Sequence, residues 1–302
     1  MSKRVIVTGG AGFIGSNLVD VLIEKGYDVH IIDNLVAGNK EYVNPKATLH
    51  EVDITNLEEI KPLFLGVDYV FHLAALPRVQ YSIEQPIETD SVNVRGTLNV
   101  LVAASEAKVK KFVYSASSSA YGDQPVMPLR EDMMAAPKSP YAVQKYIGEM
   151  YCSTWSAVYG IPTVCLRYFN VYGPRHSHEG AYALVVAKFM HLKKEGKTLT
   201  ITGDGKQTRD FTHVRDVARA NILAAENTEI SKGEVINIGA GKNYSVNDIA
   251  HLIGGEIEYI PARLEPKDTL ADNTRAQKLL GWKPEISVEE GIAELKAQAG
   301  IV

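Results

Sequence analysis

One glycine motif constrains this chain more than any other sequence feature: Gly9, Gly12 and Gly15 stand three residues apart. The motif follows a short apolar run, Arg4–Val7, and precedes a stretch with helical spacing of leucine and valine, Ser16–Lys25. Glycines between a buried strand and a helix allow a tight turn, a close approach of backbone to a phosphate, and close packing of helix on strand. The chain is therefore expected to open with a strand–turn–helix unit that binds a dinucleotide.

Apolar runs of strand length alternate with helical patterns through the first half of the chain. Further strands are predicted at Val29–Asp33, Thr48–Asp53, Asp68–Leu73, Lys111–Ser115 and Pro162–Tyr168. A short helix is predicted after the third strand and through Phe64, and longer helices are predicted over Val92–Ala107 and Tyr141–Tyr159. This alternation is typical of an α/β fold with a doubly wound, mostly parallel sheet of the Rossmann type. We assign this sheet to residues 1–168.

The alternation weakens after Asn170, where glycines and charged residues become frequent. Short strands are predicted at Leu199–Ile201 and Val235–Ile238, and helices at Ala183–Glu195, Val214–Glu226 and Val246–Leu252. We expect residues 169–302 to form a smaller α/β lobe whose long loops contact the substrate. The two parts are expected to interleave, with a strand and a helix of the second part returning to the main domain.

Composition excludes several classes of protein. The 302 residues are 45% hydrophobic and carry a net charge of -4, so a polyanionic partner such as nucleic acid is not expected. No apolar run is long enough to span a membrane, and the first strand begins too early for a signal peptide. We therefore expect a cytoplasmic protein. No metal site is expected, because Cys152 and Cys165 lack metal spacing and His176 and His178 lack a third ligand.

An acidic residue at the end of the second predicted strand indicates which dinucleotide binds. Asp33 can accept hydrogen bonds from the adenosine ribose hydroxyls, and its charge would repel a 2′-phosphate. No Arg or Lys follows it immediately, so NAD is favoured over NADP. Asp53 and Ile54, after the third strand, are placed to meet the adenine; the alternative is that Asp53 only shapes a turn.

A tyrosine and a lysine four residues apart, Tyr141 and Lys145, lie one turn apart on a predicted helix. A phenol titrates near pH ~10, and a nearby ammonium together with a positive nicotinamide ring would favour its phenolate form. The serine-rich stretch Ser115–Ser119 ends the fifth strand, at the sheet edge where ligands of open α/β sheets bind. These residues suit proton transfer from a sugar hydroxyl during hydride transfer. The alternatives are an exposed helix face and a plain serine-rich loop.

Taken together, the motifs resemble the extended short-chain dehydrogenase/reductase family, and within it the NAD-dependent epimerases and dehydratases of nucleotide sugars. The resemblance covers essentially the whole chain and is greatest for the UDP-glucose (UDP-hexose) 4-epimerases. The matching stretches are Thr8–Gly15, Asp33–Leu35, His72–Ala75, Asn93–Thr97, Ser115–Gly122, Ser139–Tyr141 with Lys145, Leu166–Pro174, Gly203–Phe211, Ala271–Asp272 and Leu280–Trp282.

The resemblance implies a role for each matching residue. Tyr141 would be the base, Lys145 its electrostatic helper and ribose contact, and Ser117 the hydroxyl relay, with Ser118 as second choice. NAD contacts are implied for Gly9, Gly12, Phe13, Ile14, Gly15, Asp33, Asn34, Gly38, Asp53, Ile54, Leu73, Ala74, Ala75, Asn93, Ser115, Tyr141, Lys145 and Tyr168. Contacts with the nucleotide sugar are implied for Ser117, Tyr141, Asn170, Arg209, Arg263 and Thr269, with Asn170, Arg209 and Arg263 at the diphosphate.

A comparison within the family favours epimerisation over elimination of water. Its 4,6-dehydratases carry an aspartate and a glutamate just after the relay hydroxyl, and its decarboxylases keep a glutamate there. This chain has Ser118 and Ser119, followed by Ala120, and so offers no carboxylate. Thr269 stands where some members carry a bulky tyrosine near the sugar C2 substituent. The smaller threonine suggests that UDP-N-acetylglucosamine and its galacto epimer are accepted beside UDP-glucose and UDP-galactose.

Several alternatives remain open from the sequence. A UDP-glucuronate 4-epimerase needs a basic group near the sugar carboxylate, and Arg175 is available for it. A net sugar reductase and a dehydratase of the same family are further enzyme alternatives, and a regulator that binds NAD without turnover is an alternative of another class. The long helices Val92–Ala107 and Tyr141–Tyr159 are predicted either to form the face of a homodimer or to pack in the core.

Overall fold

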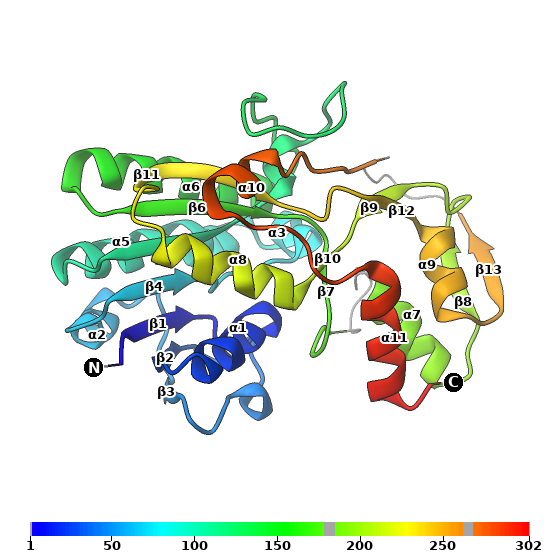
Figure 1. Ribbon diagram of the computed structural model, residues 1–302, viewed down its shortest axis with the longest axis horizontal. Helices are drawn as coiled ribbons and strands as arrows, with labels where there is room; N and C mark the ends of the chain where they lie inside the picture. Colours follow the sequence, from blue (N-terminus) through cyan, green and yellow to red (C-terminus); the bar gives the residue numbers. More distant parts are fainter. Residues whose placement is uncertain (1, 178–184, 262–267, 302) are drawn as a thin grey trace.

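A seven-stranded parallel sheet forms the centre of the computed structural model, which describes residues 2–177, 185–261 and 268–301 (Figure 1). Its strand order is β11-β6-β5-β4-β1-β2-β3, so the strands run outward in both directions from the first one. The strands are β1 (Arg4–Thr8), β2 (Asp28–Ile32), β3 (Thr48–His50), β4 (Tyr69–His72), β5 (Lys111–Ser117), β6 (Thr163–Tyr168) and β11 (Lys232–Ile238). The predicted doubly wound α/β fold is confirmed.

Helices cover both faces of this sheet. One face carries α1 (Phe13–Glu24), α8 (Val214–Glu226) and α10 (Thr274–Leu280), and the other carries α2 (Leu57–Ile60), α5 (Thr97–Glu106) and α6 (Pro140–Tyr159). Successive residues of a strand face opposite sides of a sheet. In β1, Val5 and Val7 accordingly join the core under α1 and α8, whereas Ile6 joins the core under α5 and α6. Both faces are therefore apolar, as a buried parallel sheet requires.

Several elements differ from their sequence-based predictions. The third strand ends at His50 rather than Asp53, and the helix predicted from Val92 begins with a π-helical turn, η3 (Ser91–Gly96). Two unpredicted helices precede it, α3 (Val79–Glu84) and α4 (Pro86–Asp90). Helices this short show too few turns for an apolar period to be recognised. Single 3-10 turns are η1 (Lys40–Tyr42), η2 (Lys61–Phe64) and η4 (Ser118–Tyr121).

A smaller lobe lies beyond the carboxyl ends of the main strands (Figure 1). Its helices α7 (Val185–Lys194), α9 (Val246–Ile253) and α11 (Val288–Ala299) pack with the parallel pair β8 (Leu199–Thr202) and β13 (Ile257–Ile260). Shorter pairs lie between the lobes: β7 (Val171–Tyr172) with β10 (Thr212–His213), and β9 (Thr208–Asp210) with β12 (Asn243–Ser245). The small lobe has its own apolar core, which includes Phe189 and Ile249.

The second half of the chain also contributes to the main lobe. β11 pairs with β6 and completes the sheet, and α10 packs beside it. The helix at Val214–Glu226, α8, packs against α1, so a helix of the second half of the chain also lies in the main lobe. Trp282 is fully buried in the core under α8, and its indole donates to the Asp216 carbonyl at 2.9 Å. The chain is thus anchored to the main lobe before it returns to the small one.

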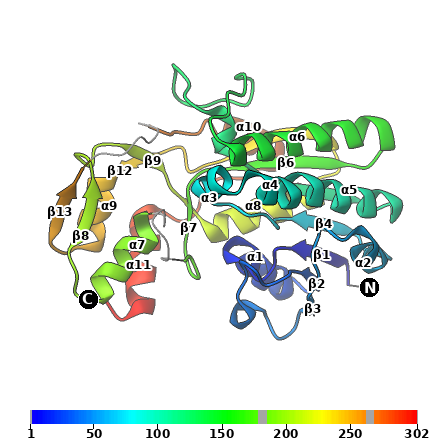
Figure 2. The ribbon, with the colours of Figure 1, turned by 180° about the vertical axis from the view of Figure 1, so that it is seen from behind.

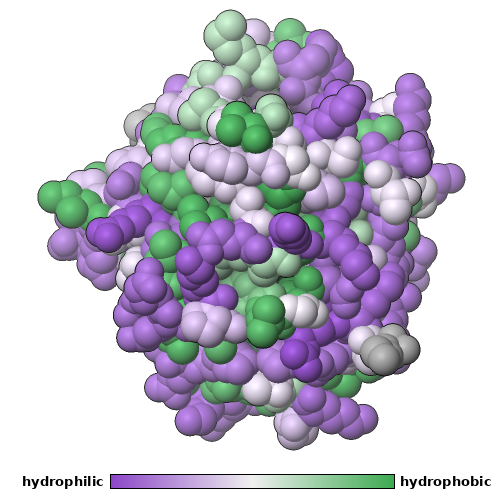
Figure 3. Space-filling model, turned by 90° about the vertical axis from the view of Figure 1, so that its left-hand side faces the viewer, coloured by the Kyte–Doolittle hydropathy of each residue, from purple (hydrophilic) through white to green (hydrophobic). Residues whose placement is uncertain are grey.

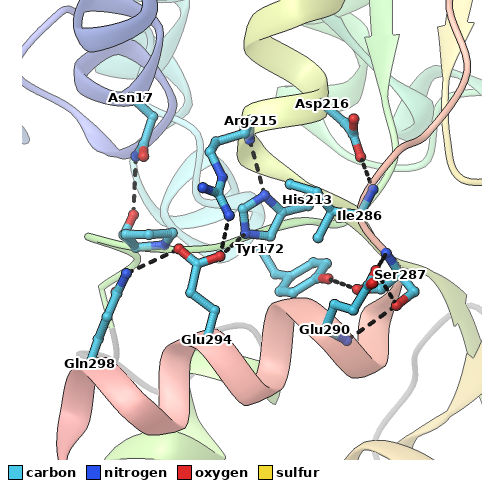
Figure 4. Close-up of polar contacts among 11 residues, drawn as sticks. Asn17, Tyr172, His213, Arg215, Asp216, Ile286, Ser287, Glu290, Glu294 and Gln298 are labelled. Carbon is cyan, nitrogen blue, oxygen red and sulfur yellow. Dashed lines mark hydrogen bonds and ion pairs between the residues drawn. The ribbon is translucent and has the colours of Figure 1, made fainter.

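A polar junction joins the two lobes near the start of α8 (Figure 4). Glu294 on α11 pairs with Arg215 and accepts a hydrogen bond from Gln298 at 3.0 Å. The Asp216 carboxylate accepts backbone hydrogen bonds from the segment that leads into α11, and Tyr172 donates to the Ser287 carbonyl at 3.1 Å. The start of α8, which belongs to the main lobe, is thus bonded to α11 of the small lobe and to the segment before it.

The end of the molecule opposite the small lobe is shown in Figure 3. Apolar residues lie there in separate patches among hydrophilic ones, without a single dominant apolar surface. Among the helices that the structure describes, none has both the length and the apolar character needed to cross a membrane.

Candidate active site

The glycine motif forms a tight turn between β1 and α1. Gly9 has a φ of 71° and lies against the backbone after β4, where a Cβ on it would come within 2.7 Å of the Ala74 nitrogen. Gly15 packs on the Gly9 carbonyl, so a side chain there would overlap the turn. Gly12 is the N-cap of α1 and supplies no side-chain cap. The first-turn N–H groups, including those of Phe13 and Ile14, therefore face outward as donors for an anion.

Asp33 follows β2 at the edge where this turn lies. It is 8% exposed, and its carboxylate accepts hydrogen bonds from the Ala11 N–H at 3.0 Å and the Leu35 N–H at 2.9 Å. Burial raises the pKa of this carboxyl, and the two backbone hydrogen bonds oppose that rise. Gly38 lies against Asp33, since a Cβ on it would come within 2.7 Å of an Asp33 carboxylate oxygen. The predicted ribose ligand is thus held beside the glycine turn.

The other predicted adenosine contacts lie on the neighbouring loops. The Asn34 side chain donates to Asp53 at 2.7 Å, and Asp53 also accepts the Thr55 N–H at 2.7 Å, so this aspartate does shape a turn. Ile54 is buried in the core, 5% exposed. After β4, the N–H groups of Leu73 and Ala74 donate to the Thr8 hydroxyl, and Ala75 follows. Adenine contacts by Asp53 and Ile54 stay a prediction.

The Tyr141–Lys145 pair lies at the start of α6. Ser139 caps the helix by accepting the Ala142 N–H at 3.2 Å, and Pro140 occupies its first turn, as suits its fixed φ. The Tyr141 N–H donates to the Ser82 hydroxyl at 3.0 Å, so the short helix α3 also holds this turn in place. The cap from Ser139 and the hydrogen bond from α3 therefore fix the backbone of Tyr141.

Ser117 lies at the end of β5 beside the Tyr141 phenol. Its oxygen accepts hydrogen bonds from the Ser119 N–H at 3.2 Å and the Ser119 hydroxyl at 2.8 Å. With its acceptor sites used in this way, the Ser117 O–H remains the group that can donate. Ser118, the second candidate, starts the 3-10 turn η4. The contact with Tyr141 distinguishes Ser117 from Ser118.

Lys145 is 5% exposed, and its ammonium donates to the Ser115 carbonyl at 2.8 Å. It also lies 5.1 Å from the centre of the Tyr114 ring, within range of a cation–π contact. Burial lowers the pKa of Lys145 to about 8. The Ser115 hydroxyl contacts the Tyr168 hydroxyl at 3.0 Å, which in turn donates to Asn221 at 2.9 Å. These contacts link the ends of β5 and β6.

The titration of Tyr141 differs from the simple expectation for a base. Burial raises its pKa to about 12, and the Ser117 hydroxyl only partly opposes that rise. The Lys145 ammonium is engaged by the Ser115 carbonyl in this arrangement. Of the two positive charges expected to favour the phenolate, the one on the nicotinamide ring would act only when the cofactor is bound.

Three of the predicted substrate residues, Asn170, Arg209 and Thr269, lie close together where the lobes meet. Asn170, with a φ of 28°, donates to the Thr269 hydroxyl at 3.1 Å and the Asp210 carbonyl at 3.2 Å. Arg209 lies next to Asp210 in strand β9, and its guanidinium donates to the Thr208 carbonyl at 2.9 Å. The buried Asp210 carboxylate accepts backbone N–H groups of residues 240, 241 and 271, which joins these loops. Arg263 lies outside the described residues.

Sequence reasoning missed a buried ion pair between α6 and β6. Glu149, one turn after Lys145, accepts hydrogen bonds from Arg167 at 2.8 and 2.7 Å, and both side chains are almost fully buried. Arg167 also lies over the Tyr121 ring at 4.4 Å. The four-residue spacing of Lys145 and Glu149 was a usable signal, but their partner on β6 was not visible from helix periodicity.

Asn93 has a different environment from the one its predicted role suggests. Its side chain accepts from the Leu76 N–H at 2.8 Å and donates to the Leu76 carbonyl at 3.1 Å and to Gln144 at 2.8 Å. It therefore fixes the loop after β4 to α6, and a contact with NAD stays a prediction. Among the described residues no cluster of three or more His, Cys, Asp or Glu side chains is arranged for a metal; His178 lies outside them.

The site as a whole fits a dinucleotide. The glycine turn, Asp33 and the loop after β4 lie at the carboxyl ends of β1, β2 and β4, and Ser117 and Tyr141 lie beside the end of β5. A model of the NAD-dependent epimerase/dehydratase family matches residues 5–239. The chain belongs to this family. NAD is therefore its cofactor, and the resemblance found in the sequence is confirmed.

Close relatives of this family member act on UDP-sugars. A UDP-glucose 4-epimerase of Mycolicibacterium smegmatis is 37% identical, and the match covers 96% of each chain. The solved UDP-glucose 4-epimerase of Thermotoga maritima with UDP-glucose is 39% identical, with a TM-score of 0.93 and 98% of each chain covered. The UDP-N-acetylglucosamine 4-epimerase of Methanobrevibacter ruminantium, in complex with UDP-N-acetylmuramic acid, is 36% identical with a TM-score of 0.92, covering 98% of this chain and 99% of the other.

The wider set of relatives also includes a UDP-glucuronate 4-epimerase and a UDP-N-acetyl-alpha-D-glucosaminuronate decarboxylase. This chain is therefore an NAD-dependent enzyme of the UDP-sugar epimerase/dehydratase family. Relatives of similar identity are named for different sugars.

The buried ammonium of Lys145 predicts a pH-dependent stability. In the folded, NAD-free protein its pKa is about 8, against 10.5 in an unfolded chain. Between these pH values the unfolded state binds more protons, so stability rises with pH there. The free energy of unfolding of the wild type should therefore rise relative to that of Lys145→Met as pH increases from 8 toward 10.5. Denaturant titrations across this range measure the difference.

The matched control is Lys110→Met, because the Lys110 ammonium is exposed and its ion pair with Asp68 raises rather than lowers its pKa. The stability difference between wild type and this control should not rise through the same window. A flat difference for Lys145→Met as well would show that the lysine titrates normally.

Proposed function

We propose that this enzyme inverts C4 of a UDP-hexose, with NAD as a hydride carrier that is oxidised again at the end of each turnover. The observation that carries the proposal is the contact between the Tyr141 phenol and the Ser117 hydroxyl, at a sheet edge where residues 118 and 119 are both serines. This arrangement provides a path for the C4 hydroxyl proton. Neither of these two positions supplies a carboxylate.

In the proposed mechanism Ser117 hydrogen-bonds the sugar C4 hydroxyl, and Tyr141 accepts its proton through Ser117. NAD, which the glycine turn and Asp33 would hold, would supply a hydride acceptor for C4 and a hydride donor to the opposite face of the 4-keto sugar. Tyr141 then gives the proton back to the C4 oxygen, so that proton and hydride both return to the sugar. Lys145, held by the Ser115 carbonyl, supplies positive charge below the phenol.

Elimination of water needs an acid and a base near C5 and C6 of the sugar. The two positions after the relay hydroxyl are Ser118 and Ser119, and the Ser119 hydroxyl donates to Ser117. A serine hydroxyl that is committed to Ser117 cannot serve as a general base of carboxylate strength. Epimerisation is therefore favoured over the dehydratase and decarboxylase chemistries of the family.

The nature of the sugar is argued from Thr269 and Arg175. Thr269 accepts a hydrogen bond from Asn170, the residue expected at the diphosphate. Its short side chain favours acceptance of an acetamido group on the sugar. Arg175 was the candidate for binding a uronate carboxylate, but its guanidinium pairs with Asp20 on α1 at 2.6 Å. This pairing argues against a uronate. In this proposal residues 1–168 bind NAD and residues 169–302 supply most contacts with the nucleotide sugar.

We further propose a homodimer formed through α6 and its neighbours. Val143 and Met150 on α6 are 42% and 47% exposed, and their spacing of seven residues places them on one helix face. Ile83 on α3 and Ile87 on α4 are 54% and 86% exposed. The helices α3, α4, α5 and α6 lie side by side on this side of the molecule (Figure 2). A group of exposed apolar side chains on adjacent helices favours a protein–protein contact.

The direct test is incubation of the purified enzyme, without added cofactor, with UDP-glucose, UDP-galactose, UDP-N-acetylglucosamine and UDP-glucuronate. Inversion at C4, followed by NMR, is expected with the two neutral pairs and not with the glucuronate. The variant Thr269→Tyr should lose the acetylated pair and keep the other, whereas Thr269→Ser should keep both. No inversion of any substrate would refute the proposed activity.

The role of Tyr141 is tested by Tyr141→Phe. Loss of general acid–base catalysis should lower kcat at least ~100-fold. The NAD content of the purified variant should stay that of the wild type, because the change removes a single hydroxyl. Unchanged turnover would exclude Tyr141 as the base.

The proposed dimer is tested by Met150→Glu and, as a second variant, Val143→Glu. Each places a charge in an apolar contact, so both should shift the protein from dimer to monomer in sedimentation velocity runs at micromolar concentration. The matched control is Val126→Glu, which changes an equally apolar residue, 54% exposed, on the loop after η4. A monomeric wild type would overturn this part of the proposal.

A further inference from the structure

A segment from the second half of the chain contacts the helix that follows the glycine turn. Asn17 on α1 donates to the Phe13 carbonyl at 2.9 Å and to the Pro174 carbonyl at 3.1 Å. The His176 ring stacks on the Phe13 ring, with 4.3 Å between centroids and 3° between planes. Figure 4 shows Asn17 reaching from α1 toward this segment. Segment 174–176 therefore touches the first turn of α1, where the free N–H donors lie.

Arg175 extends these contacts to a second part of the cofactor lobe. Its guanidinium pairs with Asp20 at 2.6 Å and lies 5.9 Å from the centre of the Tyr42 ring. The other Asp20 carboxylate oxygen accepts the Asn44 side-chain amide at 2.7 Å. Arg175 and Asp20 thus connect α1 to the loop of residues 38–44.

That loop in turn closes against the predicted ribose ligand. The Asn39 N–H donates to the Ala11 carbonyl of the glycine turn at 2.9 Å. Gly38 lies against the Asp33 carboxylate, which accepts the Ala11 N–H. The loop, the glycine turn and Asp33 therefore form one connected unit, and Arg175 reaches it from the other half of the chain.

Segment 174–176 has two features that are unfavourable for folding, a strained backbone and unsatisfied buried nitrogen atoms in the described part of the chain. Arg175 has a φ of 67°, in the left-handed region that is unfavourable for a residue with a Cβ. Nη1 of Arg175 and Nδ1 of His176 are buried and make no hydrogen bond within the described part of the chain. Strain and unsatisfied buried groups persist where a function selects the geometry.

We propose that Pro174–His176 acts as a latch that holds NAD in the enzyme by keeping the glycine turn and the 38–44 loop closed around its adenosine half. The inference rests on membership of the NAD-dependent family and goes beyond the proposed choice of sugar. An enzyme that removes a hydride from its substrate and later returns it must keep the reduced cofactor bound until the second transfer. A latch supplied by the substrate half of the chain would serve this need.

The test measures how fast NAD leaves the enzyme and how much NAD the purified enzyme contains. Arg175→Ala and His176→Ala should each increase the rate of NAD release from the holoenzyme on the order of tenfold, as expected for the loss of one favourable contact. Release is followed by chase of radiolabelled NAD, and the NAD content of each purified variant is measured by extraction. The affinity for UDP, measured by calorimetry, should not change, because the latch holds the cofactor and not the nucleotide sugar.

A double-mutant cycle separates positioning from general destabilisation. If Arg175 acts through Asp20, then Asp20→Asn should have little further effect once Arg175→Ala is present, and Arg175→Lys should restore part of the NAD retention. Arg4→Ala is the control, since it removes an exposed ion pair with Asp28 at 2.8 Å on the same lobe. NAD release at the wild-type rate in both latch variants would overturn the proposal, whatever the sugar specificity. Equal weakening of UDP and NAD binding would also overturn it.

Discussion

The close contact of the glycine turn with its neighbours is the constraint on which the rest of the site depends. Gly9 has the backbone of the β4 exit against it, and Gly15 lies on the Gly9 carbonyl. Only the absence of side chains allows α1 to begin this close to the sheet, with its first N–H groups free for a diphosphate. Asp33, the 38–44 loop and the residues after β4 all take their positions from this turn.

The proposed catalytic groups share a second feature, burial beside the sheet edge. Lys145 has lost most of its contact with water and is compensated by one carbonyl oxygen, and the Glu149–Arg167 pair lies one turn away. Burial by itself opposes ionisation of both Lys145 and Tyr141. In the proposed mechanism the positive nicotinamide ring of bound NAD would oppose this effect and favour the Tyr141 phenolate, which would couple cofactor retention to chemistry.

The return of the chain explains why the two lobes cannot be divided at one sequence position. β11 and α8 follow the first residues of the small lobe, yet they complete the main sheet and cover α1. The 174–176 segment and the junction around Glu294 then tie the second half of the chain to the first. In the proposed function, cofactor and substrate contacts would therefore come from interleaved segments.

The spacing of residues within short stretches of sequence was enough to predict the glycine turn, the acidic residue after β2 and the Tyr141–Lys145 pair. The strand–glycine–helix pattern, the acidic residue after β2 and the four-residue separation of Tyr141 and Lys145 are properties of short stretches, because helix and strand geometry fix which neighbours share a face. Contacts between distant segments could not be obtained in this way. The pairing of Arg175 with Asp20, of Glu149 with Arg167 and of α8 with α1 was decided by the tertiary structure, since each joins elements whose approach depends on the packing of the whole sheet.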